Sequence, residues 1–472
     1  MDIGSSSVRA ALFDEAGKLL PATLVRRGHN FSATTHGGEE IDPDRTFREV
    51  TALIDDVLQK STRVKGEITH VASCAFWHSL LGVDAKGRPT TKVLTWADTR
   101  SKKCTDVLRK RFDETEVHHR TGARFHSSFW PAKLAYIRNE LPDVWRRTAR
   151  WLSFSDYLLA RLCGTATTSV SMASATGLFD QRKCIWDAEL LRYLKLDTNQ
   201  LPVTAESDFA SFELNTIFKK RWPRLKNALW FPAVGDGAAN NIGSGCVTKT
   251  RAALMIGTSG AMRVAYRGEP PEKLPPGLWS YRVDRKRVIV GGALSDGGNL
   301  YEWLKRTLRI DLPDASIAAE MARRGADTHG LTVMPFFFGE RSTGYNEDAR
   351  GSIIGLNSSH DAFDILQAAM ESVAFRFADI FDQLNKVTRI REIVVSGGAL
   401  AASPVWTQII ADVLGRDLLI SNEPEASLRG TCLLALESID ETMQIRTPNE
   451  KKVKFHPACH VIYKSARRRH RR

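Results

Sequence analysis

Several signatures that would assign a protein class directly are missing from this sequence. The seven cysteines include no Cys-x-x-Cys pair and are odd in number, which argues against a disulfide framework or a zinc ribbon. The N-terminus has neither a basic region nor the apolar core of a signal peptide. The charge-free stretch at residues 393–411 is interrupted by glycine, proline and polar residues. We therefore expect a cytoplasmic protein in a reducing compartment, with no membrane partner.

Net charge is the unusual quantity of the composition. The 472 residues include 67 Lys and Arg against 54 Asp and Glu, a formal charge of +13. Residues 464–472 hold six of these bases and no acid, so that the surplus without them is +7. No zinc-finger spacing, RRM-type motif or basic-zipper heptad accompanies the bases. We interpret residues 464–472 as a frayed basic tail and the other clusters as solvated surface, so a nucleic-acid partner is not favoured.

Helix and strand patterns alternate along the chain, which favours the α/β class, and the length corresponds to two or three domains. Helical spacing of apolar residues covers 45–60, 102–112, 131–140, 155–162, 299–308, 361–387, 404–414 and 427–437. Short apolar runs predict strands at 71–75, 79–83, 252–256, 260–265, 288–290 and 393–395. The pattern is interrupted near residues 225–235, where we place a domain boundary.

Two short segments, half a chain apart, resemble each other. Residues 3–9 and 256–263 each contain Ile-Gly, then hydroxyl residues, then small apolar residues and an arginine. Gly-Ser turns are common, so coincidence is one interpretation. The other is a pair of related lobes that each present a hairpin turn to one shared cleft. These few positions leave both interpretations open.

Two further segments place an acid beside glycine. Asp2 precedes the turn Gly4–Ser7, whose N–H groups and hydroxyls can contact phosphate while Asp2 holds Mg²⁺; a plain hairpin turn is the alternative. Asp236 lies between Gly235 and Gly237, where it can orient a hydroxyl and accept its proton; a helix N-cap is the alternative. No P-loop and no dinucleotide-binding fingerprint is present.

Other candidate ligand contacts follow apolar strands or mix aromatic with polar groups. The turn at Gly257-Thr258 and the pairs Gly291-Gly292, Gly297-Gly298 and Gly397-Gly398 follow strands, where α/β folds bind ligands. Aromatic and polar residues alternate at residues 76–79, 95–100 and 126–133. Such a mixture suits a sugar, although tryptophans are more often core residues.

In this order, the motifs resemble those of the FGGY carbohydrate kinases, most closely the bacterial gluconate kinase branch. The resemblance extends from Asp2 to about Tyr463. It is carried by DIGSSSVRAALFD, SCAFWHSLLGVDAKGRP, TWADTR, RTGARFHSSFWPAKL, GDGAANNIGSG, IGTSGAMR, GGALSDGGNLYEWL, FFFGERSTGYNEDARGSIIGL and VSGGALAASPVW. Any one of these segments is weak, whereas the ordered set is specific.

The resemblance implies an α/β fold of two actin/hexokinase-like (ribonuclease H-like) lobes around a cleft. Each lobe would have a five-stranded mixed sheet, with a substrate lobe at residues 1–232, a nucleotide lobe at 233–463 and a basic tail at 464–472. It also implies ATP, Mg²⁺ and transfer of the γ-phosphoryl group to a sugar or sugar-acid hydroxyl. For the branch in question, the reaction would convert D-gluconate to 6-phosphogluconate.

The resemblance also assigns roles residue by residue. Asp236 matches the catalytic Asp, and Asp2 and Asp236 would hold Mg²⁺. Nucleotide contacts fall on Ser5, Ser6, Gly257, Thr258, Gly298, Glu302, Gly398 and Ala402. Substrate contacts fall on Trp77, His78, Asp98, Ser128, Phe129 and Asp236. For the carboxylate of a sugar acid, Arg100, Arg124 and Lys133 are unranked candidates.

Three departures from the family pattern leave alternatives open. Met1 directly precedes Asp2, so we expect a shortened first strand, a weakened sheet and a mobile Asp2. Some relatives carry Asn where this chain has Ala402, and the basic end has no counterpart. The alternatives to a gluconate kinase are a kinase for another polyol or ketose such as xylulose, or a non-catalytic pseudo-kinase that senses sugar or nucleotide. The oligomeric state stays open, a homodimer included.

Overall fold

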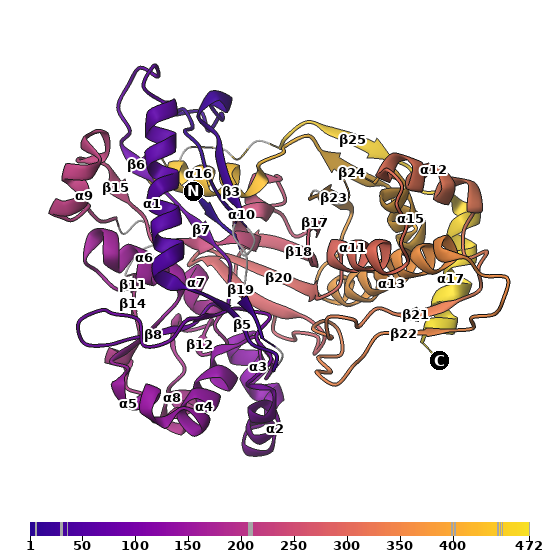
Figure 1. Ribbon diagram of the computed structural model, residues 1–472, viewed down its shortest axis with the longest axis horizontal. Coiled ribbons are helices and arrows are strands. Elements are labelled where there is room, and N and C mark those ends of the chain that lie inside the picture. Colours follow the sequence, from indigo (N-terminus) through magenta and orange to yellow (C-terminus); the bar gives the residue numbers. More distant parts are fainter. Residues whose placement is uncertain are drawn as a thin grey trace.

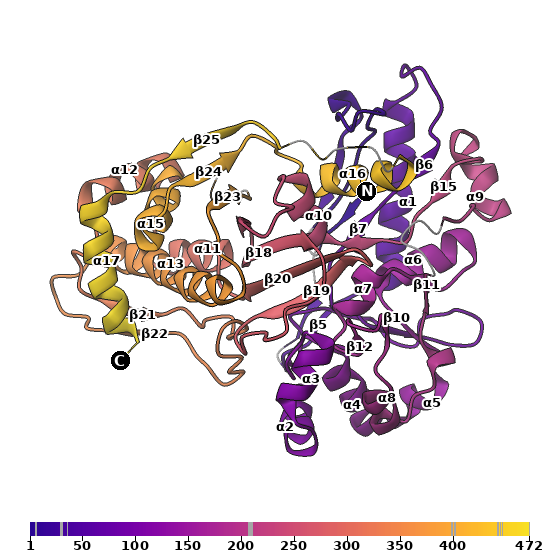
Figure 2. The same ribbon diagram turned by 180° about the vertical axis from the view of Figure 1, so that it is seen from behind.

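The computed structural model describes residues 1–4, 7–28, 32–34, 36–205, 211–397, 400, 403–440, 443, 445 and 447–471. Its chain forms two α/β lobes, with most elements of the first half on one side and most of the second half on the other (Figure 1). Strands of the second half run through the middle of the molecule toward the first lobe, as the reverse view also shows (Figure 2). The predicted two-lobed fold is confirmed.

The sheet of the first lobe has five strands. Their order is β16 (Val234–Gly235), β7 (Cys74–Ala75), β1 (Asp2–Ile3), β2 (Ser7–Ala10) and β3 (Val25–Gly28). Helix α1 (Pro43–Lys60) packs on β2 and β3, and α16 (Ala426–Ile439) packs on β1 and β7. The two helices thus cover the central part of the sheet, where Ile3 and its partner Val8 are fully buried.

The sheet of the second lobe has seven strands rather than the expected five. Their order is β19 (Trp279–Asp284), β20 (Arg287–Leu294), β18 (Gly260–Arg267), β17 (Arg251–Ile256), β23 (Glu392–Ser396), β24 (Leu418–Ser421) and β25 (Glu450–Val453). The extra strands are at the two edges: β19 pairs antiparallel with β20, and β25 pairs antiparallel with β24.

The two lobes share one local topology. In the first, β1 pairs antiparallel with β2 and parallel with β7. In the second, β17 pairs antiparallel with β18 and parallel with β23. The similar segments at residues 3–9 and 256–263 thus form equivalent hairpins, and the interpretation as two related lobes holds over coincidence.

Helix α10 (Asp236–Gly243) crosses α16 at backbone contact. A Cβ added at Gly243 would overlap the carbonyl oxygen of Ala426, and one at Gly430 would overlap that of Ala239. Only glycine permits so close a crossing. Helix α16 therefore lies among the elements of the first lobe, although it comes late in the sequence (Figures 1 and 2).

The predicted helices of the second half are present as α11 (Gly298–Thr307), α13 (Ala362–Val387) and α15 (Pro404–Leu414). Helix α13 begins with a capping box in which Asp361 and Asp364 satisfy each other's backbone N–H groups. Its apolar face packs on β18 and β20 and against α15. This packing fixes the core of the second lobe, and the N-terminus of α11 lies beside the β17–β18 turn, where the Gly298 and Asn299 N–H groups donate to the Gly257 and Thr258 carbonyl oxygens.

The remaining elements form a helical extension of the first lobe and the outer shell of the molecule. The helices are α2 (Lys102–Arg111), α3 (Glu114–Thr121), α4 (Trp130–Glu140), α5 (Pro142–Arg147), α6 (Phe154–Cys163), α7 (Val170–Ser174), α8 (Ala188–Leu194), α9 (Thr216–Arg221) and α12 (Asp314–Arg324). The strands are β4 (Ser32–Ala33), β5 (Glu39–Ile41), β6 (His70–Val71), β8 (Leu81–Val83), β9 (Val93–Leu94), β10 (Arg150–Leu152), β11 (Thr167–Thr168), β12 (Phe179–Asp180), β13 (Ile185–Trp186), β14 (Val203–Thr204), β15 (Leu229–Trp230), β21 (Thr332–Met334) and β22 (Ser352–Ile354).

The basic C-terminal end is not frayed. Residues Pro457–His470 form helix α17, in which Tyr463 and Ala466 are buried. Its arginines pair with acids far away in the sequence: Arg467 and Arg471 with Asp379 and Asp382, and Arg469 with Asp327. Long-range pairing, which a count of charges does not reveal, orders this end.

The state of the cysteines and the length of the apolar helices relate to the expected compartment and to the expected absence of a membrane partner. All seven cysteines are free thiols. Of the helices in the described part of the chain, none combines the length and the apolar character that crossing a bilayer requires.

Candidate active site

Two cavities meet where the second-lobe hairpin turns. One, of about 270 Å³, lies between the lobes and is lined from both, by residues that include Asp2, Trp77, His78, Asp236 and Arg263. The other, of about 430 Å³, lies within the second lobe. Gly257 and Thr258, in the β17–β18 turn, line both cavities. A ligand in one cavity can therefore reach a ligand in the other past this turn.

Asp236 occupies the first position of α10, directly after β16. Its Oδ1 accepts a hydrogen bond from the Gly237 N–H (2.7 Å), while its Oδ2 has no hydrogen-bond partner among the described residues. Burial raises the pKa of this carboxyl to about 6, against the opposing effect of the Arg263 charge. Asp236 thus presents one free carboxylate oxygen to the cavity at neutral pH.

Trp77 and His78 follow β7 and form one wall of the cavity. The Trp77 ring packs directly on Gly235 and Gly237, where any Cβ would overlap it. His78 has a φ of 68°, in the left-handed region that is strained for a non-glycine residue. The buried ammonium of Lys133 donates to the His78 carbonyl oxygen (2.7 Å), and His78 Nδ1 donates to the Ala175 carbonyl oxygen (2.6 Å). These bonds leave His78 Nε2 as an acceptor.

Burial keeps the histidines of this wall neutral and lowers the pKa of its lysine. It lowers the pKa of His78 to about 3, that of His126 to about 4 and that of Lys133 to about 7. His126 Nδ1 accepts a hydrogen bond from the Ser128 N–H (3.1 Å), and Ser128 Oγ donates to the Trp96 carbonyl oxygen (2.7 Å). The wall therefore offers hydrogen bonds rather than charge.

The structure brings most of the predicted substrate contacts together, but not all. Trp77, His78, Ser128, Phe129 and Asp236 line the shared cavity. Asp98 does not: it is fully buried and pairs with Arg100, a residue two positions along the chain.

The three cations suggested for a sugar-acid carboxylate also lie away from the cavity lining. Arg100 pairs with Asp98 and Glu40, and Arg124 pairs with Glu114. Lys133 is directed at the His78 carbonyl.

Two arginines that sequence reasoning did not select do line the cavity: Arg263 is buried and Arg341 is half-buried. Arg263, in β18, has no acceptor for its buried Nε and Nη1 among the described residues. Arg341 donates to the Leu294 carbonyl oxygen (2.9 Å), and its guanidinium lies 4.5 Å from the centre of the Trp96 ring. Tyr345, which is buried, completes this side. For Arg263, the sequence did contain a signal that could have identified it: a charged residue between the apolar residues Met262 and Val264 of a predicted strand.

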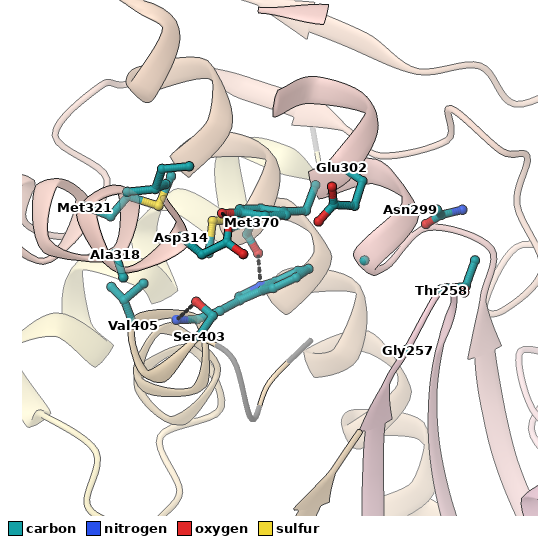
Figure 3. A pocket seen from close by; sticks show the side chains of 14 residues that line it. Gly257, Thr258, Asn299, Glu302, Asp314, Ala318, Met321, Met370, Ser403 and Val405 are labelled. Atoms are coloured by element: carbon teal, nitrogen blue, oxygen red, sulfur yellow. Dashed lines mark hydrogen bonds between the residues drawn. The ribbon is translucent and has the colours of Figure 1, made fainter. Parts of the chain in front are cut away.

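The second cavity is lined by four of the predicted nucleotide contacts: Gly257 and Thr258 of the β17–β18 turn, and Gly298 and Glu302 at the N-terminal end of α11. Figure 3 shows Thr258 at one end of the cavity and Met321 at the other, with Glu302 and Asp314 across from Ser403 and Val405. The floor includes Tyr301 and Trp406, whose ring centres are 6.1 Å apart in a stacked arrangement. Trp406 is fixed by a hydrogen bond from its Nε1 to the Met370 carbonyl oxygen (3.1 Å).

Four predicted nucleotide contacts, Ser5, Ser6, Gly398 and Ala402, lie outside the described residues. Sequence reasoning missed Asp314, Ile317, Met321 and Trp406, which line the second cavity. These residues come from α12 and α15, so their proximity depends on how distant helices pack.

Asp2, expected to be mobile, is buried instead. It pairs with Arg9 and accepts a hydrogen bond from Cys74 Sγ (3.3 Å). Asp2 and Asp236 line the same cavity, and carboxylate oxygens are ligands that Mg²⁺ prefers. The donor set therefore fits Mg²⁺, with Asp236 offering a free oxygen and Asp2 an oxygen already shared with Arg9.

Comparison with known proteins assigns the arrangement to a family. The N-terminal domain of the FGGY family of carbohydrate kinases matches residues 1–243, and the C-terminal domain matches residues 252–438. The chain belongs to the FGGY family of carbohydrate kinases. It is accordingly a phosphotransferase with an alcohol group as acceptor, and ATP and a sugar are its substrates.

Individual relatives carry two different substrate names. A gluconokinase from Bacillus subtilis is 27% identical over 458 residues, 92% of this chain and 86% of that protein. A gluconate kinase structure from Lactobacillus acidophilus superposes with a TM-score of 0.90 at 25% identity, over 100% of this chain and 96% of the other. A ligand-bound xylulose kinase from the same species gives 0.91 at 25% identity, with the same coverage. The family thus follows from these comparisons, whereas the particular sugar does not.

Proposed function

We infer that this kinase transfers the γ-phosphoryl group of ATP to the 6-hydroxyl of D-gluconate and forms 6-phosphogluconate. The observation that carries this inference is the charge of the cavity around Asp236. The guanidinium groups of the buried Arg263 and the half-buried Arg341 line the cavity with the single Asp236 carboxylate, while the nearby histidines are neutral. Asp2 adds no net charge because it pairs with Arg9. A cavity with one surplus positive charge suits a monoanionic sugar acid better than a neutral sugar.

Asp236 orients the acceptor hydroxyl in this proposal. Its Oδ1 is held by the Gly237 N–H, so the carboxylate cannot turn away, and Oδ2 is left to accept a hydrogen bond from the hydroxyl. Phosphoryl transfer passes through a loose transition state, in which positioning matters more than early proton removal. The carboxylate then takes the proton late in the transfer, which requires that Asp236 be ionised.

The second cavity would hold the nucleotide, with its phosphates directed at the β17–β18 turn. Gly257 and Thr258 are at the junction of the two cavities, and Gly298 and Glu302 line the part within the second lobe. Mg²⁺ would be held by Asp236 and, through water, by Asp2, and it would neutralise charge on the phosphates. In this proposal residues 1–232 form the substrate lobe and residues 233–463 the nucleotide lobe. The chain passes from one to the other at β16.

A ketose kinase is the second candidate, because a xylulose kinase structure superposes as well as the gluconate kinase structure does. A coupled assay of ADP release with ATP, Mg²⁺ and, in turn, gluconate, xylulose, ribulose and glycerol separates the two. We expect the highest kcat/KM with gluconate. ADP release with xylulose and none with gluconate would overturn the gluconate assignment. Absence of turnover with every sugar, despite ATP binding, would favour the pseudo-kinase.

A further inference from the structure

Arg263 differs from the other buried arginines of this protein. It is only 7% exposed, yet neither its Nε nor its Nη1 has an acceptor in the described part of the chain. By contrast, Arg282 donates to the Gln181 carbonyl oxygen and to Glu269, and Arg287 pairs with Asp284 and Glu437. A buried guanidinium without an acceptor is costly for folding. Such a residue calls for a ligand that supplies the missing acceptor.

The surrounding backbone makes room for this side chain. A Cβ at Gly291 would lie 3.0 Å from Arg263 Cγ, and one at Gly237 would lie 3.0 Å from its Nε and 3.1 Å from its Cζ. The guanidinium therefore extends across two glycines to a position beside Asp236. Among the described residues the two side chains nevertheless form no ion pair. Burial lowers the pKa of Arg263 to about 10, which leaves it charged at neutral pH.

The groups around Arg263 suit a small, polyhydroxylated anion. Trp77 Nε1 is also buried without a partner in the described structure, and Trp77 and Tyr345 line the same cavity. The Trp77, Trp279 and Tyr281 rings pack against one another at centre distances of 4.4 to 5.8 Å and give the cavity an aromatic wall. Aromatic faces and scattered donors bind a carbon chain with hydroxyls, and a guanidinium binds a carboxylate.

We propose that Arg263 is the specificity-determining residue of this site and binds the carboxylate of an aldonic acid substrate. The proposal rests on the proposed function and deepens it, because it names the residue by which the enzyme selects a sugar acid over a neutral sugar. Arg341 has a different role: its Nε also lacks an acceptor among the described residues, but its Nη2 donates to the Leu294 carbonyl oxygen and its guanidinium lies over the Trp96 ring, so it shapes the cavity. The other anion that Arg263 can meet is the transferred phosphoryl group, and the test separates the two.

The test compares gluconate with D-gluconamide, which keeps every hydroxyl and replaces the carboxylate by a neutral amide. Steady-state kinetics with ATP and Mg²⁺ are measured for the wild-type enzyme, Arg263→Gln and the control Arg267→Gln. Arg267 is on the same strand but is exposed and pairs with Glu437. Loss of a charge-assisted hydrogen bond corresponds to a decrease of about 10- to 100-fold. We expect this decrease in kcat/KM of Arg263→Gln for gluconate, mainly through KM, and less than about 5-fold for gluconamide.

The melting temperature without substrate distinguishes a binding role of Arg263 from a structural role, because loss of a structural contact would lower it. Because Arg263 is buried without an acceptor, we expect Arg263→Gln to melt at the same temperature as the wild type or higher. A lower melting temperature together with equal losses for gluconate and gluconamide would overturn the proposal in favour of a structural residue. Equal losses that fall on kcat, with unchanged melting, would overturn it in favour of a contact to the phosphoryl group.

Binding of gluconate, measured by calorimetry in the presence of a non-hydrolysable ATP analogue, separates failure of this proposal from failure of the proposed function. If wild-type protein binds gluconate without phosphorylating it, the proposed function is wrong, and the binding loss in Arg263→Gln still decides the role of the arginine. If gluconate neither binds nor reacts while xylulose does, both are wrong.

Discussion

The two strands that flank β1 have unpaired main-chain groups beyond Met1, and this gap in the sheet can be filled by a designed extension of β1. The β1–β2 register places a residue added before Met1 opposite Ala11, and the third added residue opposite Phe13. The β1–β7 register places the same residues beside Ala72 and His70. In this described region, the main chains of Ala11 and Phe13 and the Ala72 N–H form no hydrogen bond. The Met1 ammonium occupies the start of the gap and donates to the Ala72 carbonyl oxygen (2.7 Å).

The gap is also apolar on both sides. It opens into a cavity of about 720 Å³ lined by Ile54, Val57 and Leu58 of α1 and by Leu428 and Leu436 of α16, among others. An added strand of four residues, Val-Ile-Val-Ile, would place side chains against both helices. It would complete ladder bonds on two edges, each worth about 1 kcal/mol, and bury apolar side chains worth about 2 kcal/mol each. Ordering four residues costs about 1.5 kcal/mol per residue.

From these terms we expect the extension to stabilise the protein by about 5 kcal/mol, which for a chain of this length corresponds to about 5 °C in melting temperature. The matched control adds Gly-Ser-Gly-Ser, which displaces the ammonium equally but supplies no apolar side chains and little strand propensity. Thermal melting by circular dichroism measures both variants. A Val-Ile-Val-Ile variant that melts within 1 °C of its Gly-Ser control would refute the reasoning.

The pH dependence of the extended protein supplies a second check. Burial lowers the pKa of the Met1 ammonium, whereas the unfolded amine titrates near 8. Below about pH 8 the unfolded chain therefore binds more protons than the folded one, and this group destabilises the fold increasingly as the pH falls. Either extension moves the amine away from this site. We expect both variants to lose this contribution and to gain most at low pH.

Three further predictions concern the site and the lobe connection. Asp236→Asn should lower kcat by about 10³-fold while ATP still binds, and wild-type kcat/KM should rise as the pH passes about 6. Because the pKa of Asp236 is raised from 3.8 to about 6, ionisation of this carboxyl lowers the stability of the wild-type fold as the pH rises through that range. Asp236→Asn should therefore be more stable than the wild type at pH 8 by up to about 3 kcal/mol. Unchanged turnover in this variant would exclude Asp236 from the chemistry. Tyr301→Ala should raise KM for ATP about 10-fold through lost stacking, with KM for the sugar unchanged; equal increases in both would place the nucleotide elsewhere. Gly430→Val should cost about 3 kcal/mol by forcing α16 away from α10, whereas Gly28→Val, which meets nothing nearby, should cost far less; equal losses would contradict the close crossing.

Local periodicity was sufficient for much of the fold. The helices over residues 45–60 and 361–387 are present almost as predicted, as α1 and α13, because each has one apolar face and a clear cap. The edge strands β19 and β25 were not predicted. Residues Trp279–Asp284 do alternate apolar and polar side chains, so a strand signal was present and was overlooked, although all six residues are buried in the fold. Residues Glu450–Val453 are mostly charged, and their strand forms only by pairing with β24.

Charge was the least predictable property, because its meaning depends on partners that are distant in sequence. The arginines of α17 suggested a loose tail, yet they pair with acids of α13 and the loop at Asp327. Arg263 received no role because an arginine in a strand is usually directed at solvent. Asp98 was predicted to contact substrate, although Arg100 two residues later was available as a local partner.

The most direct test of a gluconate kinase is a competition in one tube. Equal concentrations of gluconate, xylulose and glycerol are incubated with the enzyme, Mg²⁺ and limiting ATP, and the phosphorylated products are identified by mass spectrometry. The product ratio then reports the ratio of kcat/KM values. Our account predicts that 6-phosphogluconate dominates. A product mixture dominated by xylulose phosphate or glycerol phosphate would contradict it.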